Sequence, residues 1–124
     1  MRITDVQALG RTEGIRVVPA LSDYDGHSER WIEAEYRAHP RGTQSVAGYW
    51  EGEPGWVRID VWPYTEICVM IAGRVAIEDA EGALREFGAG EAFLVPAGFS
   101  GRWHTLETSQ KYFIGIVPDA APRA

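Results

Sequence analysis

The residues best suited to chemistry lie in a short stretch near the middle of the chain. They comprise two carboxylates, a phenol, a thiol and an indole, with a second tryptophan later in the sequence: Asp60, Trp62, Tyr64, Glu66, Cys68 and Trp103. Side chains alternate between the two faces of a β-strand, so if Glu66 points inward, Cys68 and Met70 do too. Aromatic walls with a few polar groups are typical of a small-molecule site.

Glu66 is the candidate for acid–base catalysis. Burial disfavours the charged form of a carboxyl group, so we expect the pKa of Glu66 to be raised toward neutrality, where a general acid or base works best. A buried carboxylate also needs a partner, and Arg58, on the same strand face as Asp60, and Tyr64 are candidates. The alternative is that Glu66 is structural, held by a hydrogen bond to a tyrosine or tryptophan.

The other candidates have structural alternatives as well. Asp60 also fits an exposed strand end, and Trp62 and Trp103 also fit core packing. Cys68, flanked by apolar residues, is typical of a small buried side chain, and no histidine is in register to activate it as a nucleophile. The sequence has no phosphate-binding glycine loop before a helix, no Gly-x-Ser-x-Gly and no Cys-x-x-Cys.

Short apolar runs separated by glycine, proline and aspartate must position these residues. Their patterns predict strands at 15–18, 28–36, 46–50, 56–62, 67–71, 74–78, 83–87, 91–95 and 110–117. The run 67–71 is apolar throughout, which predicts a strand buried on both faces. Asp79 to Gly82 predicts a hairpin turn, and no segment predicts a helix longer than ten residues. The pattern favours an all-β sandwich or barrel.

Composition excludes several classes of protein. The 124 residues suit one domain, and the net charge of −6 without a basic cluster argues against a nucleic-acid partner. The single cysteine cannot form an internal disulfide. The sequence contains no apolar run of about 18 residues, the length that would indicate a membrane span. The first residues lack the apolar core of a signal peptide. We therefore expect a cytoplasmic protein that binds neither nucleic acid nor membrane.

Four sequence blocks, at 48–51, 66–75, 87–93 and 96–103, resemble the motifs of the cupin superfamily. They are similar in particular to the small single-domain cupins grouped with the (S)-ureidoglycine aminohydrolase and the ethanolamine-utilisation proteins. The resemblance implies an all-β cupin fold, the double-stranded β-helix or RmlC-like jelly-roll barrel, over 41–118. Residues 1–40 are then an irregular N-terminal extension that packs on the barrel or on a dimer partner, and 119–124 a tail.

The resemblance also has implications for metal binding. Metal-dependent cupins hold a transition metal with three histidines and a glutamate, and Glu66 falls in the glutamate position. The histidine positions hold other residues: Asp60 and Trp62 (or Ile59 and Val61), and Gly101. His104 alternates with Trp103, so it is predicted to point away from the interior. We expect no metal site and no cofactor.

Three functions stay open. The first is a protein that binds or transforms a small molecule in the barrel without the three-histidine metal; the resemblance implies a nitrogen-containing molecule. The second is a metalloenzyme with a reduced ligand set, Mn or Zn on Asp60 and Glu66 plus water. The third is a non-catalytic barrel that serves assembly.

We also expect a homodimer. Apolar side chains occur along the irregular first 40 residues and need a cover: Ile15, Val17, Val18, Trp31, Ile32 and Tyr36. A sheet edge left unpaired is a liability, and a strand from a twofold-related copy would cover it.

Overall fold

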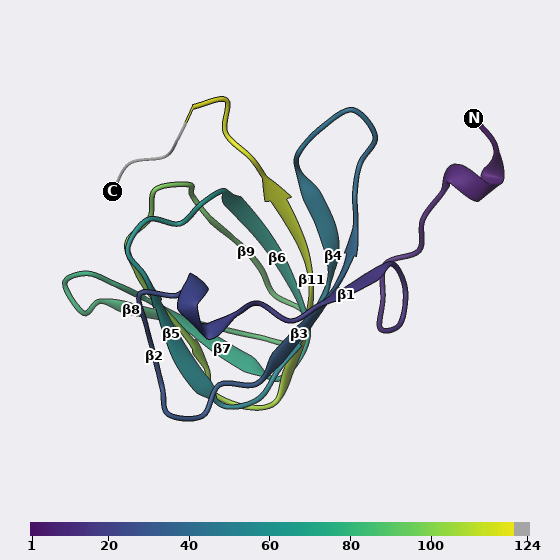
Figure 1. Cartoon of the computed structure of the whole chain (residues 1–124). Coiled ribbons are helices and arrows are strands. Elements are labelled where there is room, and N and C mark those ends of the chain that lie inside the picture. The colour runs from purple at the N-terminus through teal and green to yellow at the C-terminus, as the bar shows by residue number, and fades with distance from the viewer. Residues whose placement is uncertain (121–124) are drawn as a thin grey trace.

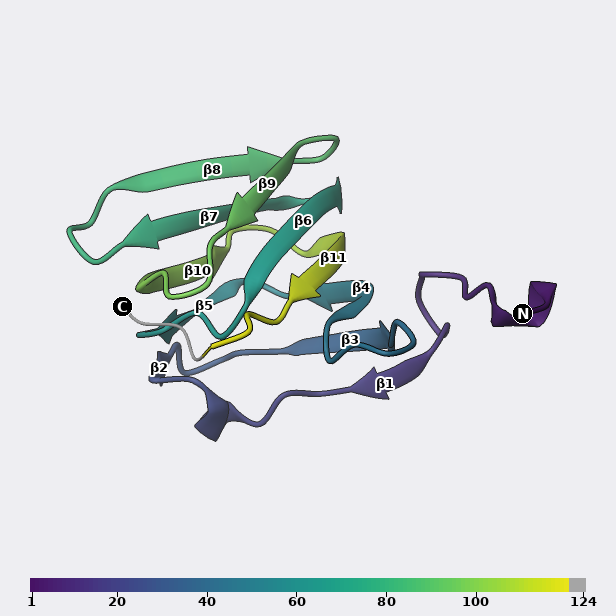
Figure 2. The same ribbon diagram turned by 90° about the horizontal axis from the view of Figure 1, so that it is seen from above.

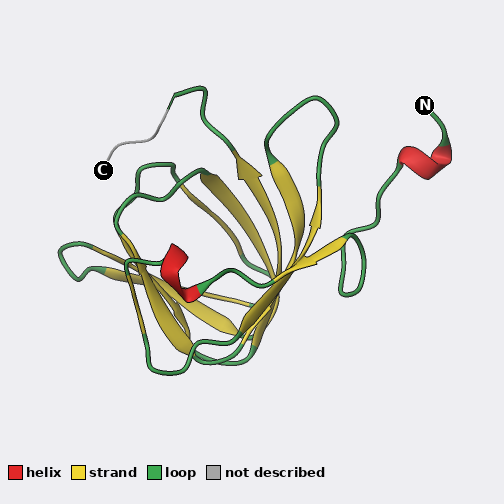
Figure 3. Cartoon of the chain, viewed as in Figure 1, coloured by secondary structure: helices red, strands yellow, loops and turns green. Residues whose placement is uncertain are grey.

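The chain is almost entirely β-structure. The computed structural model describes residues 1–120, in which two short 3-10 turns, η1 (Ile3–Asp5) and η2 (Leu21–Asp23), are the helical elements. Eleven strands form two antiparallel sheets that face each other (Figure 1; Figure 3). The prediction of an all-β fold without long helices is confirmed.

The two sheets differ in size. The large sheet contains, in spatial order, β1 (Ile15–Val17), β3 (Glu33–Ala38), β4 (Val46–Gly52), β11 (Ser109–Ile116), β6 (Thr65–Ala72) and β9 (Ala92–Val95). The small sheet contains β2 (Gly26–His27), β5 (Gly55–Ile59), β10 (Gly101–Thr105), β7 (Arg74–Asp79) and β8 (Leu84–Gly88). Figure 2 shows the two layers from above.

The expected N-terminal extension contributes strands to both layers. β1 pairs with β3, and β3 pairs with β4 in the large sheet, whereas β2 pairs with β5 in the small one. The first residues, before β1, project beyond the edge of the large sheet (Figure 1). Of the expected tail, residues 121–124 lie outside the described residues.

Most predicted strands form, but three details were wrong. The strand expected at 28–36 begins at Glu33, and the one expected at 56–62 ends at Ile59. β6 is not buried on both faces: Cys68 and Met70 are 0% and 2% exposed, whereas Val69 and Ile71 are 43% and 38% exposed. A run of apolar residues does not distinguish a strand that is buried on both faces from one whose outer face is exposed.

The hairpin turn at 79–82 is confirmed. The Asp79 carboxylate accepts hydrogen bonds from the backbone N–H groups of Glu81 and Ala83, at 2.9 and 3.0 Å. Gly82 has a φ of 89°, which lies in the left-handed region that glycine tolerates best. The turn joins β7 to β8.

Aromatic side chains fill the space between the sheets. Trp103 on β10 meets Trp50 of the opposite sheet edge-to-face, with 5.5 Å between ring centroids, and its indole N–H donates to Thr105 at 3.1 Å. Gly101, Trp103 and Thr105 are buried. His104 points the other way, where its Nε2 lies 2.8 Å from a Glu78 oxygen. The predicted alternation along this strand is therefore confirmed.

Trp103→Ala should lower the free energy of unfolding by about 3–5 kcal/mol, because it removes a buried indole from between two sheets. Urea unfolding followed by circular dichroism measures the loss. Trp56→Ala is the control, since Trp56 is half-buried and packs against the Arg102 guanidinium at 4.3 Å; its loss should be smaller. Equal losses for both variants would show that Trp103 is not a core residue.

Candidate functional site

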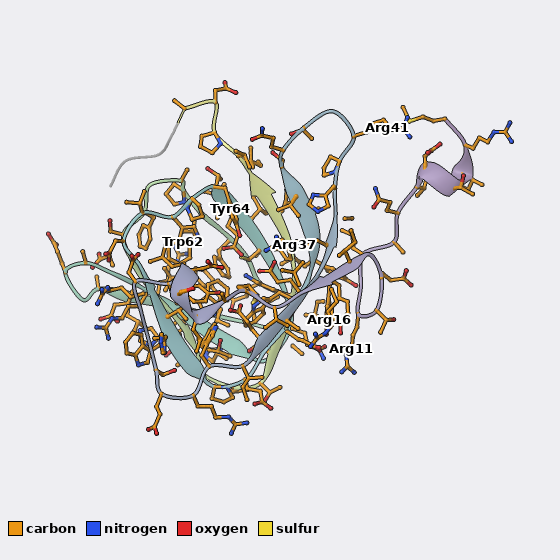
Figure 4. All side chains as sticks on the ribbon, in the orientation of Figure 1. Arg11, Arg16, Arg37, Arg41, Trp62 and Tyr64 are labelled. Carbon is orange, nitrogen blue, oxygen red and sulfur yellow. The ribbon has the colours of Figure 1, made fainter. Side chains whose placement is uncertain are left out.

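A cavity of about 200 Å³ lies between the sheets, here called the interior pocket. Its aromatic lining consists of Tyr24, Trp31, Trp50, Trp62, Tyr64 and Trp103. Its charged lining consists of Asp23, Glu33, Glu35, Arg37, Glu66 and Lys111. Figure 4 labels three of these residues, Arg37, Trp62 and Tyr64, which come from different parts of the chain.

Two of the charged lining residues, Lys111 and Glu66, form a buried ion pair. Lys111 Nζ, on β11, donates to Glu66 Oε2, on β6, at 2.5 Å, and the two side chains are only 4% and 10% exposed. Cys68 Sγ lies 3.4 Å from both partners, and the Trp62 indole donates to Glu66 Oε1 at 3.2 Å. All polar atoms of the pair thus have partners, which a buried ion pair requires.

Aromatic rings complete the surroundings of Lys111. Its ammonium lies 3.9 Å from the ring centroid of Trp103 and 5.0 Å from that of Trp50. Both distances are within the range of cation–π attraction. The two tryptophans therefore add cation–π attraction to the ion pair.

The ion pair outweighs the effect that burial alone would have on the pKa values of Glu66 and Lys111. Burial would raise the pKa of Glu66, but the Lys111 ammonium and three hydrogen bonds outweigh it and lower that pKa. Burial would likewise lower the pKa of Lys111, but the Glu66 carboxylate raises it. The expectation that the pKa of Glu66 shifts toward neutrality was wrong, because the sequence did not reveal the lysine.

Glu33 forms a second polar centre on the pocket wall. Its carboxylate accepts hydrogen bonds from the Tyr24 hydroxyl, from the Trp31 indole at 2.6 Å and from the Trp50 indole at 2.8 Å. All three donors are neutral. None of these contacts of Glu33 is with a basic side chain.

Glu35 follows two positions later on the same face of β3. Arg37 Nε donates to its Oε2 at 2.6 Å. Burial nevertheless raises the pKa of Glu35, against the opposing effect of Arg37. The structure thus shifts Glu35 toward the neutral form.

Four predicted site residues line the interior pocket: Trp62, Tyr64, Glu66 and Trp103. Tyr64 has room there because Gly115 faces it; a Cβ on Gly115 would come within 2.8 Å of the Tyr64 ring. Cys68 lies behind Glu66, fully buried and outside the lining. Burial and the Glu66 carboxylate raise the pKa of its thiol, which opposes a nucleophilic role.

Asp60 does not point into the pocket, and that part of the prediction was wrong. The inward residues of β5 are Val57 and Ile59, and the strand ends there, so Asp60 follows on the outer side. A bend at 60–61 then turns Trp62 inward. Asp60 is exposed and accepts from Arg58 Nε at 3.1 Å, the partner that the sequence suggested.

The sequence patterns did not reveal Lys111, Glu33 and Glu35 as pocket residues. Lys111 alternates with Phe113, whereas the other face of β11 carries more apolar residues, so composition alone favours the wrong face as the inner one. Residues 33 and 35 share a face with Trp31, and a charged face is normally expected to lie outside. In each case the alternation showed which side chains share a face of the strand, but not which face lies inside.

The residues present do not fit the metal site of the metal-dependent cupins. Beside Glu66 stand an ammonium, a thiol and an indole N–H rather than imidazoles, and Asp60 lies outside the pocket. Within residues 1–120, no group of three or more His, Cys, Asp or Glu side chains is arranged to hold a metal ion. A reduced set built on Asp60 and Glu66 is not brought together either.

Comparison with known proteins identifies the family. A family model described as the EutQ-like cupin domain matches residues 40–113. The chain belongs to this family. No curated protein matches it. Among the residues described, no helix has both the length and the hydropathy needed to cross a membrane.

Solved structures of similar fold agree with this assignment. The EutQ protein of Clostridium difficile has a TM-score of 0.65 at 16% identity, over 84% of this chain and 83% of the other. A putative ethanolamine utilization protein Q from Salmonella typhimurium LT2 has a TM-score of 0.64 at 18% identity, over 90% and 93%. A Rhizobium leguminosarum protein of unknown function has a TM-score of 0.60 at 16% identity, over 69% and 82%. These identities show the shared fold alone.

Lys111→Met should destabilise the protein by about 3–5 kcal/mol at pH 8, because it leaves the Glu66 carboxylate buried without a cation. Burial then raises the pKa of Glu66 above its unfolded value. Such a group loses stability above the unfolded pKa and regains it as the pH falls and the carboxyl takes up a proton. The deficit relative to the parent should therefore shrink from pH 8 to pH 5 in urea titrations.

The double variant Lys111→Met/Glu66→Gln is the matched control. It removes both charges, so it should recover much of the loss and should show no such pH dependence. If single and double variants lost equal stability at both pH values, the ion pair would not be the cause.

Metal content gives a further check. Protein purified without chelator and then dialysed should carry well under one equivalent of Fe, Mn, Ni, Cu or Zn, because no imidazole lies beside Glu66. Elemental analysis measures it. A stoichiometric metal that only a chelator removes would contradict the expectation.

Proposed function

We propose that this EutQ-like cupin binds a small organic cation, such as a protonated amine, in the interior pocket. The observation that carries the proposal is the charge of the lining: four carboxylate side chains face two basic ones. Both basic groups already have carboxylate partners, Lys111 in Glu66 and Arg37 in Glu35. The acidic excess is then on Asp23 and Glu33.

The walls of the pocket suit the same ligand. Four of the five tryptophans line it, and the faces of aromatic rings attract cations. The ammonium of Lys111 against Trp50 and Trp103 is an example within the chain itself. The volume of about 200 Å³ is below the 300 to 1,000 Å³ of roughly drug-sized sites, so the ligand is small.

The titratable groups favour binding over proton transfer or nucleophilic attack. The pKa of Glu66 is lowered and those of Lys111 and Cys68 are raised, so none of the three is shifted toward neutrality. A catalytic role for Glu66 stays a prediction. If the protein is an enzyme, Glu35, with its raised pKa, is the more suitable acid or base.

The other two hypotheses have less support. A metalloenzyme built on Asp60 and Glu66 would need both carboxylates at one place, and Asp60 is exposed on the outside. A barrel that serves assembly alone gains nothing from buried charges, because apolar residues of similar volume stabilise a core at least as well. The cytoplasmic location expected from the sequence stays a prediction.

A matched set of ligands tests the proposed charge preference. The name of the Salmonella protein of similar fold makes ethanolamine a reasonable first amine, and ethylene glycol and glycolate are a neutral and an anionic molecule of nearly the same size. Titration calorimetry and tryptophan fluorescence should show the tightest binding for ethanolamine. Tighter binding of glycolate, or equal binding of all three, would contradict the proposal.

Glu33→Gln should weaken binding of the cation by roughly 10- to 100-fold, the usual contribution of a hydrogen bond to a charged group, because it removes one of the two carboxylates that make up the acidic excess of the lining. Binding by the parent should also weaken as the pH falls through the raised pKa of Glu35, because protonation of Glu35 leaves the Arg37 guanidinium of the lining without its carboxylate partner. Glu86→Gln is the control: it removes an exposed carboxylate, paired with Arg74 at 2.7 Å, that lies outside the pocket. Its affinity should equal that of the parent.

A further inference from the structure

A second cavity lies where the two sheets meet at their last strands. β8 ends the small sheet and β9 ends the large one, and the two strands lie on the same side of the molecule in Figure 2. The cavity between them has a volume of about 280 Å³ and is here called the edge pocket. It shares no lining residue with the interior pocket, so a ligand in it would occupy a separate site.

Phenylalanine rings form much of the wall of the edge pocket. Three of the four phenylalanines of the chain line it: Phe87, Phe93 and Phe99. Phe87 and Phe93 stack, with 4.1 Å between ring centroids and 13° between ring planes, and this stack joins β8 to β9. Contacts between aromatic rings add attraction beyond the burial of apolar area. The wall therefore suits a molecule that carries an aromatic ring.

A positive charge lies on the inner face of β8. Arg85 precedes the core residue Phe87 by two positions and pairs with Ile77 of β7, so its side chain shares their face of the sheet. An arginine is unusual on a face that packs against a core. Arg85 is exposed, and its guanidinium lies 5.2 Å from the centroid of the Phe87 ring, within the range of cation–π attraction. The cation is thus held against the wall of the edge pocket.

The charge of Arg85 is not neutralised by a neighbour. Among the ion pairs of residues 1–120, none involves Arg85. The other charged residue of the lining is Asp79, whose carboxylate already accepts hydrogen bonds from the backbone N–H groups of Glu81 and Ala83 in the hairpin turn. The planar guanidinium of an arginine suits a carboxylate, which it can bind through two parallel hydrogen bonds. The edge pocket therefore offers one site for an anionic group beside its aromatic wall.

We propose that the edge pocket binds a small carboxylate that carries an aromatic ring. The ring packs against the stacked Phe87 and Phe93, and the carboxylate pairs with Arg85. The volume of about 280 Å³ lies just below the roughly 300 to 1,000 Å³ of drug-sized sites, which limits the ligand to one or two rings. This site goes beyond the proposed amine site, because the two pockets select ligands of opposite charge.

Phenylacetate and phenylacetamide are matched probes, since they share the ring and differ in charge. In proton–nitrogen NMR titrations of the full chain, phenylacetate should bind about 10-fold more tightly, the lower end for a hydrogen bond between charged groups, because Arg85 is exposed. Its chemical-shift changes should centre on Arg85, Phe87 and Phe93. An excess of ethanolamine should not displace it, because the interior pocket is a separate site.

Arg85→Gln removes the charge and keeps a long polar side chain. It should weaken binding of phenylacetate by about 10-fold and leave binding of phenylacetamide unchanged. Arg16→Gln is the matched control, because Arg16 is exposed on β1, outside both pockets (Figure 4). Its affinity for phenylacetate should equal that of the parent, and circular dichroism should show both variants to be folded.

Several results would overturn the proposal. Equal affinity for phenylacetate and phenylacetamide, or no binding of either, would remove the anion site. Equal effects of Arg85→Gln and Arg16→Gln would show that Arg85 only covers the Phe87 ring with its aliphatic stem. Chemical-shift changes centred on Glu33 and Lys111 would place the probe in the interior pocket instead. Cyclohexylacetate binding as tightly as phenylacetate would contradict the preference for an aromatic ring.

Discussion

The ion pair between Lys111 and Glu66 is the interaction on which the interior depends. Both charges are nearly fully buried, and each would destabilise the fold without the other. Their strands, β11 and β6, are neighbours in the large sheet, so the pairing of these strands brings the charges together. Trp50, Trp62 and Trp103 then pack around the pair, which connects the tryptophan core of both sheets to one electrostatic contact.

The large sheet has an unusual distribution of polar residues. Beside core residues such as Trp50, Met70 and Phe113, its inner face carries Glu33, Glu35, Glu66 and Lys111, while the outer faces of β6, β9 and β11 carry valine, isoleucine, leucine and tyrosine. A sheet evolved for stability alone would have the opposite arrangement, since burying charges is unfavourable and burying apolar surface is favourable. The charged residues of the inner face are the part of this distribution that supports a ligand.

The match to the EutQ-like cupin domain begins at residue 40, yet much of the interior pocket comes from before it. Tyr24, Trp31, Glu33 and Glu35 all precede the match. β3 adds its carboxylates to the wall because it pairs with β4 inside the large sheet. Family membership therefore accounts for the fold and for the position of Glu66, whereas the acidic side of the pocket depends on the segment that the family model does not cover.

The sequence alone determined most of the strands, the turn at Gly82 and the inward direction of Trp103, because alternation and glycine placement are local properties of the chain. It also identified Glu66 and Trp62 as interior residues through the cupin motif. It did not reveal Lys111, which is 45 positions from Glu66, or the contact of Glu33 with Trp50. Alternation tells which side chains share a face of a strand; only the order of strands in the folded sheets decides which face lies inside and which charge meets which.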